Sequence, residues 1–309
     1  MNRKERIYVA GSSGMVGSSI VRVLESRGYE NIITSCSKEL DLRNQEETKS
    51  FFLSQKIDYV FLAAARVGGI LENSQKKAEF IYDNLQIQNN IIHHAYVNKV
   101  KKLLFLGSSC IYPKESEIPI NECQLLEGRL EETNDAYALA KIAGIKMCQS
   151  YKEQYNFNAI SLMPTNLYGF NDNFDLNSSH VIPALLRKFI EAKENYSKEV
   201  ICWGSGQPMR EFLFVDDLAD ACLFFMENYS EPEHVNIGTG QDISIRDLVN
   251  LISEIVGYEG AIKWDRTKPD GTIRKVLDVS KANKLGWKHK TTLTDGLKKT
   301  VEWYLKKET

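Results

Sequence analysis

A tyrosine and a lysine stand four positions apart, at Tyr137 and Lys141. In a helix this spacing places a phenol and an ammonium group on the same face. A free phenol loses its proton near pH ~10, but a neighbouring cation favours the phenolate and lowers its pKa toward the range where proton transfer is useful. The same pattern is typical of an ordinary amphipathic turn, so its meaning depends on the rest of the sequence.

Three glycines near the start of the chain predict a site for a dinucleotide. The segment from Ile7 to Gly17 has the character of a strand, a tight turn and the start of a helix. Gly11 and Gly14 would let the backbone turn sharply and approach a pyrophosphate, whose charge the helix N-terminus favours. Gly17 would let the helix pack closely on the strand. At the start of a βαβ unit, this pattern indicates dinucleotide binding.

The end of the second predicted strand bears on which dinucleotide is bound. An acidic residue there favours NAD by bonding the ribose hydroxyl, whereas a basic residue accepts the 2′-phosphate of NADP. The segment runs Thr34-Ser-Cys-Ser-Lys38, and the first acidic residue is Glu39. We therefore predict Lys38 as a phosphate partner, with a solvated surface lysine as the alternative.

Composition limits the classes of function that remain. The 309 residues are 43% hydrophobic and 26% charged, as in ordinary globular proteins, and the net charge of -2 gives no general attraction to nucleic acid or anionic lipid. The longest apolar run, Tyr59 to Ala65, is too short to cross a bilayer, and no secretory pattern opens the chain, so we expect a cytoplasmic protein. Six scattered cysteines and five histidines predict reduced thiols and no metal site.

The first half of the chain alternates strand-like and helix-like segments, as a parallel sheet with crossover helices requires. Strands are predicted at 6–10, 32–35, 59–64, 102–106 and 159–163, and helices at 15–27, 45–55, 73–99 and 136–155. The continuous hydrophobicity of 59–64 fits burial on both faces. The predicted fold is α/β, a Rossmann-like doubly wound parallel sheet.

Beyond Pro164 the alternation of strand-like and helix-like segments becomes less regular, which predicts a smaller C-terminal α/β lobe that binds substrate. Helices are predicted at 180–195, 245–256 and 294–305, with a short strand at 234–237 and a turn-rich segment at 203–210. We predict an NADP-binding domain over 1–165 that also receives segments near 212–240. Residues 166–309 would form mainly the substrate lobe, with a cleft between the two.

Three motifs occur in a fixed order along the chain: Gly107-Ser-Ser-Cys-Ile-Tyr-Pro113, Tyr137-x-x-x-Lys141 and Pro164-Thr-Asn-Leu-Tyr-Gly169. Together with the glycine spacing, they resemble the extended short-chain dehydrogenase/reductase family and, within it, the GDP-L-fucose synthases. Longer strings typical of that subfamily extend the resemblance over nearly the whole chain, at 63–70, 178–186, 203–206, 208–212 and 268–271.

The resemblance implies conversion of GDP-4-keto-6-deoxy-D-mannose by 3,5-epimerisation followed by NADPH-dependent reduction at C4. Asp41 and Leu42 lie where this class contacts adenine. The full set of implied cofactor contacts is Gly11, Ser12, Ser13, Gly14, Met15, Val16, Gly17, Lys38, Asp41, Leu42, Leu106, Gly107, Lys141, Pro164, Asn166, Leu167 and His180.

For the epimerisation, the resemblance implies Cys110 as the base and His180 as the acid. Protons at C3 and C5 are acidic because the carbanion delocalises onto the C4 oxygen as an enolate. Unperturbed thiols titrate near ~8.5 and imidazoles near ~6.5, so modest tuning makes both useful at neutral pH. Without the surrounding strings, a buried apolar cysteine and a hydrogen-bonded structural histidine are the ordinary interpretations.

For the reduction, the resemblance implies that Tyr137 protonates the C4 oxygen, while Ser108 hydrogen-bonds the same oxygen. Lys141 would hold the nicotinamide ribose and depress the pKa of Tyr137. A serine that merely caps the end of a strand is the alternative for Ser108.

The GDP-sugar would contact four residues of the second half of the chain. Lys188 and Arg210 could neutralise the pyrophosphate, Trp203 could cover the sugar or nucleoside, and Asp270 could accept hydroxyl hydrogen bonds. By residue type alone, Lys188 is an ordinary solvated helix charge.

Two departures from the family pattern concern the cofactor. Serines stand at Ser13 and Ser37, where the family commonly places arginines that contact the 2′-phosphate. NADP remains the expected cofactor, and use of NAD is a live alternative.

The helices at 73–99 and 136–155 resemble those that pair in homodimers of this superfamily. Ile81, Leu85, Ile92 and Tyr96 could line that face, although burial against the chain's own sheet explains the same spacing.

Three rival functions remain open at this stage. One is a GDP-sugar C4-reductase without epimerisation, including a reductase of keto-deoxyheptoses, and another is a UDP-sugar 4-epimerase with tightly held NAD. The third is a regulatory protein on a retired dehydrogenase fold, which would be expected to lose the tyrosine, lysine or serine that this chain keeps.

Overall fold

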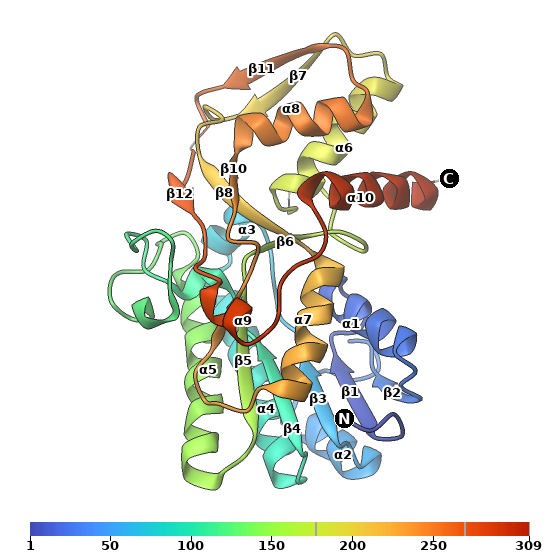
Figure 1. Cartoon of the computed structure of the whole chain (residues 1–309), viewed down its shortest axis with the longest axis vertical. Coiled ribbons are helices and arrows are strands. Elements are labelled where there is room, and N and C mark those ends of the chain that lie inside the picture. Colours follow the sequence, from blue (N-terminus) through green and yellow to red (C-terminus); the bar gives the residue numbers. More distant parts are fainter. Residues whose placement is uncertain (177, 269, 309) are drawn as a thin grey trace.

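The computed structural model describes residues 1–176, 178–268 and 270–308. Pro269, in the string 268–271, lies outside the described residues. Figure 1 shows a parallel sheet flanked by helices in one half of an elongated molecule and a smaller α/β region in the other. Within the described ranges, no helix combines the length and apolar character needed to cross a membrane. All six cysteines are free thiols.

The main sheet has six parallel strands in the order β2-β1-β3-β4-β5-β9. They are β1 (Arg6–Ala10), β2 (Asn31–Thr34), β3 (Tyr59–Leu62), β4 (Lys102–Leu106), β5 (Ala159–Pro164) and β9 (Val235–Ile237). The strand order reverses between β1 and β3, and ligands of doubly wound sheets bind beyond the carboxyl ends of the strands at that point. The predicted Rossmann-like fold is confirmed.

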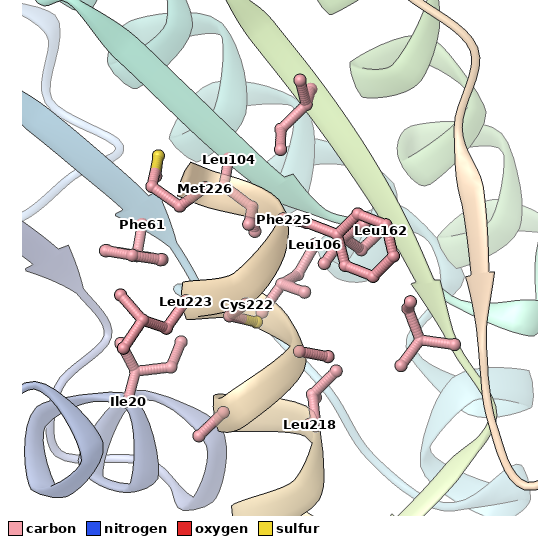
Figure 2. Packing of buried hydrophobic residues seen from close by; sticks show 14 of the residues in the cluster. Ile20, Phe61, Leu104, Leu106, Leu162, Leu218, Cys222, Leu223, Phe225 and Met226 are labelled. Atoms are coloured by element: carbon pink, nitrogen blue, oxygen red, sulfur yellow. The ribbon is translucent and has the colours of Figure 1, made fainter. Parts of the chain in front are cut away.

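Helices cover both faces of this sheet. One face packs against α1 (Met15–Ser26) and α7 (Val215–Asn228), and the other against α2 (Gln45–Gln55), α4 (Lys77–Val97) and α5 (Asp135–Tyr155). The alternation along β1 explains the division, because Ile7 and Val9 enter the first core while Tyr8 and Ala10 enter the second. Figure 2 shows Leu218, Cys222 and Phe225 of α7 packed in the first core.

The chain returns to the main sheet after its first excursion into the smaller region. α7 follows strand β8 directly and leads to β9, which pairs with β5. The ammonium group of the buried Lys102 donates hydrogen bonds to the carbonyl oxygens of Phe225, Met226 and Tyr229 at the end of α7. The Phe225 carbonyl also accepts the Tyr229 N–H at 3.1 Å, and the lysine supplies further donors to the carbonyls at this end of the helix. The sequence analysis did not predict α7.

The smaller region is built around β8 (Met209–Phe214), which pairs with β6 (Asn166–Tyr168), β10 (Asp242–Ser244) and β12 (Arg274–Lys275). A second pair joins β7 (Glu199–Trp203) to β11 (Ala261–Asp265). The helices α6 (Val181–Glu194), α8 (Ile245–Val256) and α10 (Leu293–Glu308) supply its core, and α9 (Ser280–Lys284) packs beside β9. Short 3₁₀ turns lie at η1 (Ser109–Ile111) and η2 (Glu122–Gln124).

The structure corrects two expectations about the predicted helix 73–99. It divides into α3 (Ile70–Gln75) and α4, because Lys76 has φ −119° and ψ 35°, outside the helical range. The side chain of Asn73 donates to the carbonyls of Gly68 and Gly69 and ties α3 to the preceding loop. Ile92 is fully buried in the core beside the main sheet, so it cannot contribute to a surface for a partner.

Candidate active site

The end of β4 carries two of the predicted catalytic side chains. β4 ends at Leu106, Gly107 follows, and Ser108 adopts an extended conformation that starts the turn η1. The Oγ atom of Ser108 accepts a hydrogen bond from the backbone N–H of Cys110 at 3.4 Å. The cap fixes the turn, so the serine hydroxyl and the cysteine thiol leave the same strand end. Ser108 therefore caps the backbone at the end of the strand and also lies beside the candidate site.

Helix α5 brings Tyr137 and Lys141 to this strand end. The buried ammonium of Lys141 donates a 2.8 Å hydrogen bond to the carbonyl of Leu106. Its nitrogen lies 5.7 Å from the centroid of the Tyr137 ring. Gly144 allows the close approach of helix and strand, since a Cβ atom there would lie 2.4 Å from the Phe105 ring. The predicted pair thus faces the end of β4.

The pKa of Tyr137 differs from the expectation. Burial of the phenol raises its pKa, the neighbouring Cys110 adds to the rise, and a hydrogen bond with Ser108 partly opposes it. The predicted lowering by Lys141 is wrong for the protein alone, because burial lowers the pKa of Lys141 itself to about 8 and its ammonium is directed at the Leu106 carbonyl. Desolvation therefore dominates this pair.

Cys110 lies in the same cluster and is only 9% exposed. Burial raises the pKa of its thiol, while the positive charge of Lys275, a hydrogen bond with Ser108 and the charge of Lys141 act in the opposite direction. The cysteine interacts electrostatically with both Tyr137 and Lys141. The structure therefore brings these three predicted residues together with Ser108.

His180 comes from the other half of the molecule, at the residue that precedes α6. Its side chain is exposed, yet surrounding protein atoms desolvate the imidazole enough to lower its pKa, as expected for a residue on a concave surface. The N–H of Gly69 donates to the carbonyl of Ser178 at 3.1 Å, which holds the segment before His180 against the loop after β3.

That loop links the histidine segment to Tyr137. A Cβ atom at Gly68 would lie 3.1 Å from the tip of Phe80, whose ring packs edge-on against Tyr137 with centroids 6.3 Å apart. The guanidinium of Arg66 lies over the Phe80 ring, 5.4 Å from its centroid, and pairs with Asp83 at 2.9 Å. The role of this loop was not predicted from the sequence, because it depends on contacts between distant segments.

The glycine-rich turn has the geometry that a pyrophosphate requires. Gly11 has φ +84°, and a Cβ atom there would lie 2.7 Å from the backbone of Ala64. A Cβ atom at Gly17 would lie 2.1 Å from the Gly11 carbonyl. Helix α1 begins at Met15, and its N-cap residue, Gly14, makes no side-chain cap, so the first N–H groups of the helix are available to an anion. These features fit a dinucleotide.

A cavity of about 500 Å³ continues from this turn along the end of β2. Its lining consists of Ser12, Ser13, Ser18, Val21, Arg22, Thr34, Ser35, Cys36, Glu39 and Asn171. The cation in this lining, Arg22, already pairs with Asp216 at 2.6 Å. Glu39 folds back so that its carboxylate accepts a hydrogen bond from the Cys36 N–H at 3.2 Å. Lys38 and Ser37 are exposed beside this lining.

The other predicted cofactor residues surround the carboxyl ends of the sheet or lie next to it. Asp41 pairs with Arg43 at 2.9 Å, and Leu42 packs at the margin of the second core. Leu106 and Gly107 follow β4, and Pro164 ends β5. Asn166 and Leu167 lie in β6, where the Asn166 amide donates to the carbonyl of Glu211.

The four predicted substrate residues gather in the smaller region. Trp203 is 53% exposed, and the ammonium groups of Lys188 and Lys268 lie 5.3 Å and 5.4 Å from its ring centroid. Asp270 accepts hydrogen bonds from the backbone and hydroxyl of Ser205, both at 2.7 Å. The sequence analysis did not single out Lys268, which reaches the indole from a distant loop.

Arg210 joins this group through Asp270. Burial lowers the pKa of its guanidinium, and the negative charge of Asp270 opposes that shift. The neighbouring Glu211 is fully buried and accepts N–H bonds from Thr239, Gly240 and Leu277, which fixes β8 beneath Arg210. Two or more cations with an indole and a carboxylate suit an aromatic, phosphorylated ligand. Among the described residues, no group of three or more His, Cys, Asp or Glu side chains could hold a metal ion.

Comparison with known proteins identifies the family of the chain. The model of the NAD dependent epimerase/dehydratase family matches residues 7–238. GDP-L-fucose synthase 1 of Arabidopsis thaliana is 57% identical over 305 residues, which cover 99% of this chain and 94% of the plant protein.

Two solved structures are similar over nearly the whole length. A GDP-6-OMe-4-keto-L-xylo-heptose reductase from C. jejuni has a TM-score of 0.94 at 40% identity and covers 99% of both chains. A GDP-L-fucose synthetase from Naegleria fowleri bound to NADP has a TM-score of 0.92 at 29% identity, over 100% of this chain and 96% of the other. The chain belongs to the NAD dependent epimerase/dehydratase family and, within it, to the GDP-L-fucose synthases.

Proposed function

We propose that this protein is an NADPH-dependent epimerase–reductase that converts GDP-4-keto-6-deoxy-D-mannose to GDP-L-fucose. The observation that carries the proposal is the cluster at the end of β4, where the Ser108 hydroxyl bonds the Cys110 N–H and the Lys141 ammonium of α5 bonds the Leu106 carbonyl. A thiol is not needed for hydride transfer to a ketone. Its position beside the phenol that would protonate the ketone oxygen supports enolisation and reduction in one pocket.

In the epimerisation, the Cys110 thiolate removes the proton at C3 or C5, and the electron pair moves onto the C4 oxygen. The His180 imidazolium then returns a proton to the opposite face of the same carbon, which inverts the centre. The hydroxyl of Ser108 and the phenol of Tyr137 donate hydrogen bonds to the C4 oxygen while it carries negative charge. The buried ammonium of Lys141 adds a positive potential at the same place.

For the reduction, bound NADPH would supply the hydride that C4 accepts. Tyr137 gives its proton to the oxygen as charge develops there, and Ser108 keeps that oxygen oriented. Lys141 holds the ribose next to the phenol and favours the phenolate once the proton has left. In the smaller region, Lys188 and Arg210 bind the pyrophosphate of the GDP-sugar, Trp203 covers the nucleoside, and Asp270 accepts a hydroxyl hydrogen bond.

The cofactor proposed is NADP, as in the related structure that was solved with it. NAD is a second candidate for this chain, because the lining of the cavity beside β2 includes Ser12, Ser13, Ser35 and the acidic Glu39. A ribose hydroxyl suits such a lining, whereas a 2′-phosphate would rely on Lys38 at its edge.

The assembly proposed is a cytoplasmic homodimer formed through α4 and α5. The outer faces of these helices carry exposed apolar side chains, namely Tyr82, Val97, Leu139 and Tyr155. Tyr82→Glu would place a charge in such an interface, so the mass measured by light scattering should change from that of a dimer to that of a monomer.

We also propose the division into a dinucleotide-binding domain at 1–165, joined by about 212–240, and a substrate lobe over most of 166–309.

A GDP-sugar C4-reductase without epimerisation is the second candidate function, favoured by the likeness to the heptose reductase. Incubation with GDP-4-keto-6-deoxy-D-mannose and NADPH or NADH, followed by NMR of the product sugar, separates the two. Inverted centres at C3 and C5 with a reduced C4 are expected. Reduction at C4 with both centres retained would reject the epimerase. A 4-epimerase would consume no cofactor, so absorbance at 340 nm would stay constant.

A further inference from the structure

A lysine from the smaller region reaches the candidate base. Strand β12 consists of Arg274 and Lys275 and pairs in parallel with β8, so that Lys275 stands opposite Arg210. Lys275 and Cys110 line the same cavity of about 60 Å³. The other charged residues of this lining are Lys114, Glu131 and Arg274. The pairing with β8 therefore places Lys275 in the same cavity lining as the thiol.

A buried Cys110 thiolate requires a nearby positive charge. A base must be a thiolate, but burial disfavours the charged form and raises the pKa of this thiol. Among the influences that oppose the rise, the charge of Lys275 is the largest, followed by Ser108 and Lys141. The ammonium of Lys141 is already engaged by the Leu106 carbonyl and serves the phenol. Of these two lysines, Lys275 is therefore the one whose charge acts mainly on the Cys110 sulfur.

The remaining charged groups around this cavity leave Lys275 available. Glu131 forms an ion pair with Lys114 at 3.2 Å, and Arg274 pairs with Asp242 at 2.6 Å. Within the described part of the chain, the Lys275 ammonium takes part in no hydrogen bond or ion pair with another residue's oxygen. Burial and Arg210 lower the pKa of Lys275, while Cys110 and Glu131 favour its charged form. The thiolate and ammonium therefore stabilise each other.

We propose that Lys275 is a positioning residue that stabilises the Cys110 thiolate formed during the epimerisation steps. The inference rests on the proposed function, which makes Cys110 the base. Lys275 keeps its proton throughout: the thiolate takes the carbon-bound proton and becomes a thiol, the electron pair enters the enolate, and His180 donates the replacing proton. Exchange with water restores the thiolate and the imidazolium. Lys275 supplies charge without entering the proton balance.

The test is the pH dependence of Cys110 alkylation by iodoacetamide in the full-length protein without substrate, followed peptide by peptide with mass spectrometry. The midpoint of the profile reports the thiol pKa directly, whereas a rate at a single pH also reflects nucleophilicity. Lys275→Met should move this midpoint upward by about one pH unit or more, as expected for losing a close opposite charge. Lys275→Arg should restore most of the shift.

The matched control is Lys114→Met, which removes another cation of the same cavity whose charge is already paired with Glu131. Its Cys110 midpoint should stay within about 0.3 units of the wild type. Thermal unfolding of each variant checks folding, and Lys275→Arg keeps the test decisive if Lys275→Met is unstable. In that case, a wild-type alkylation midpoint in Lys275→Arg supports the proposal. A midpoint in Lys275→Arg that is shifted upward by as much as predicted for Lys275→Met overturns it.

A second measurement separates this role from binding of the substrate pyrophosphate. Lys275→Met should slow exchange of the C3 and C5 hydrogens with deuterated water at neutral pH, recover at higher pH, and leave KM within about twofold. An unchanged alkylation midpoint together with a KM raised tenfold would make Lys275 a pyrophosphate ligand and overturn the proposal. If wild-type protein does not act on the keto-sugar, the proposed function fails, while the alkylation result still decides the Cys110–Lys275 relationship.

Discussion

The ammonium group of Lys141 lies 2.8 Å from the carbonyl oxygen of Leu106, the last residue of β4. This hydrogen bond joins the helix that carries Tyr137 to the strand end that carries Ser108 and Cys110. A lysine buried without a carboxylate partner is costly, since burial lowers its pKa to about 8. The protein tolerates this loss of stability at a place where a positive potential can stabilise an enolate or a phenolate.

The first prediction concerns this lysine. Lys141→Met should reduce the rate of NADPH oxidation by on the order of 100-fold or more, because the variant loses both the ribose ligand and the positive potential at Tyr137. Folding should survive, because removing a buried charge often leaves stability unchanged or higher. Steady-state absorbance at 340 nm and thermal unfolding measure the two effects. Lys146→Met, a change on the same helix, is the control, and an equal loss of rate in both variants would contradict this role.

The fold of the first half was predictable because its elements have strong local signals. β1, β4 and α2 begin and end at the predicted residues, since continuous apolar runs and helix periodicity mark them. Most of the elements missed are short strands of the smaller region, and the 14-residue helix α7 is the exception. β12 has two residues, both basic, and exists as a strand only because β8 pairs with it. No local pattern in the sequence indicates such an element.

The candidate site was predictable where a motif carries it. Ser108, Cys110, Tyr137 and Lys141 meet because parallel strands and their crossover helices bring their ends to one edge. The directions of the pKa shifts were not predictable from spacing, because desolvation depends on everything packed around the group. Lys275 was missed for the same reason, since its approach to Cys110 follows from tertiary pairing.

The pH profile of the epimerisation is the second prediction. Burial raises the pKa of Cys110 and lowers that of His180, so the free enzyme at neutral pH holds mainly a thiol and a neutral imidazole. The active form needs one proton on His180 and none on Cys110, which is the same total charge. The exchange rate should therefore be flat near neutrality, with an acid limb below pH ~6.5 and a basic limb above ~8.5.

Hydrogen–deuterium exchange at C3 and C5 between pH 5 and 10, followed by NMR, measures this profile. Each limb should follow its own group, so Lys275→Met should move the basic limb upward and leave the acid limb in place. A single titration with a monotonic rise would contradict the assignment of a paired acid and base.

The third prediction concerns the indole between two lysines. Trp203→Ala should weaken binding of GDP by about tenfold, because base–aromatic stacking contributes ~1–3 kcal/mol and the flanking cations lose their common surface. Isothermal titration with GDP measures the effect, and dinucleotide affinity should not change. Lys263→Met serves as a control because this exposed lysine of β11 pairs with Glu199. Undiminished GDP affinity in Trp203→Ala would place the nucleotide elsewhere.

The fourth prediction concerns choice of cofactor. Ser13→Arg places a cation in the cavity beside β2, and should raise the affinity for NADPH relative to NADH by about tenfold, since a charge-assisted hydrogen bond to a phosphate contributes ~1.5–3 kcal/mol. Glu39→Gln should shift the ratio in the same direction by removing a repelling charge. Fluorescence titration of both reduced cofactors gives the ratio without turnover. A ratio unchanged in both variants would place the 2′ position outside this cavity.

The most direct measurement is made with Tyr137→Phe, mixed with GDP-4-keto-6-deoxy-D-mannose and NADPH in deuterated water. One pocket with two separable tasks predicts deuterium at C3 and C5 of the sugar by NMR and no change of absorbance at 340 nm. Deuterium incorporation should disappear when Cys110→Ser is added to the same protein. A single variant that neither exchanges nor reduces, although it still binds GDP and NADPH, would contradict the account.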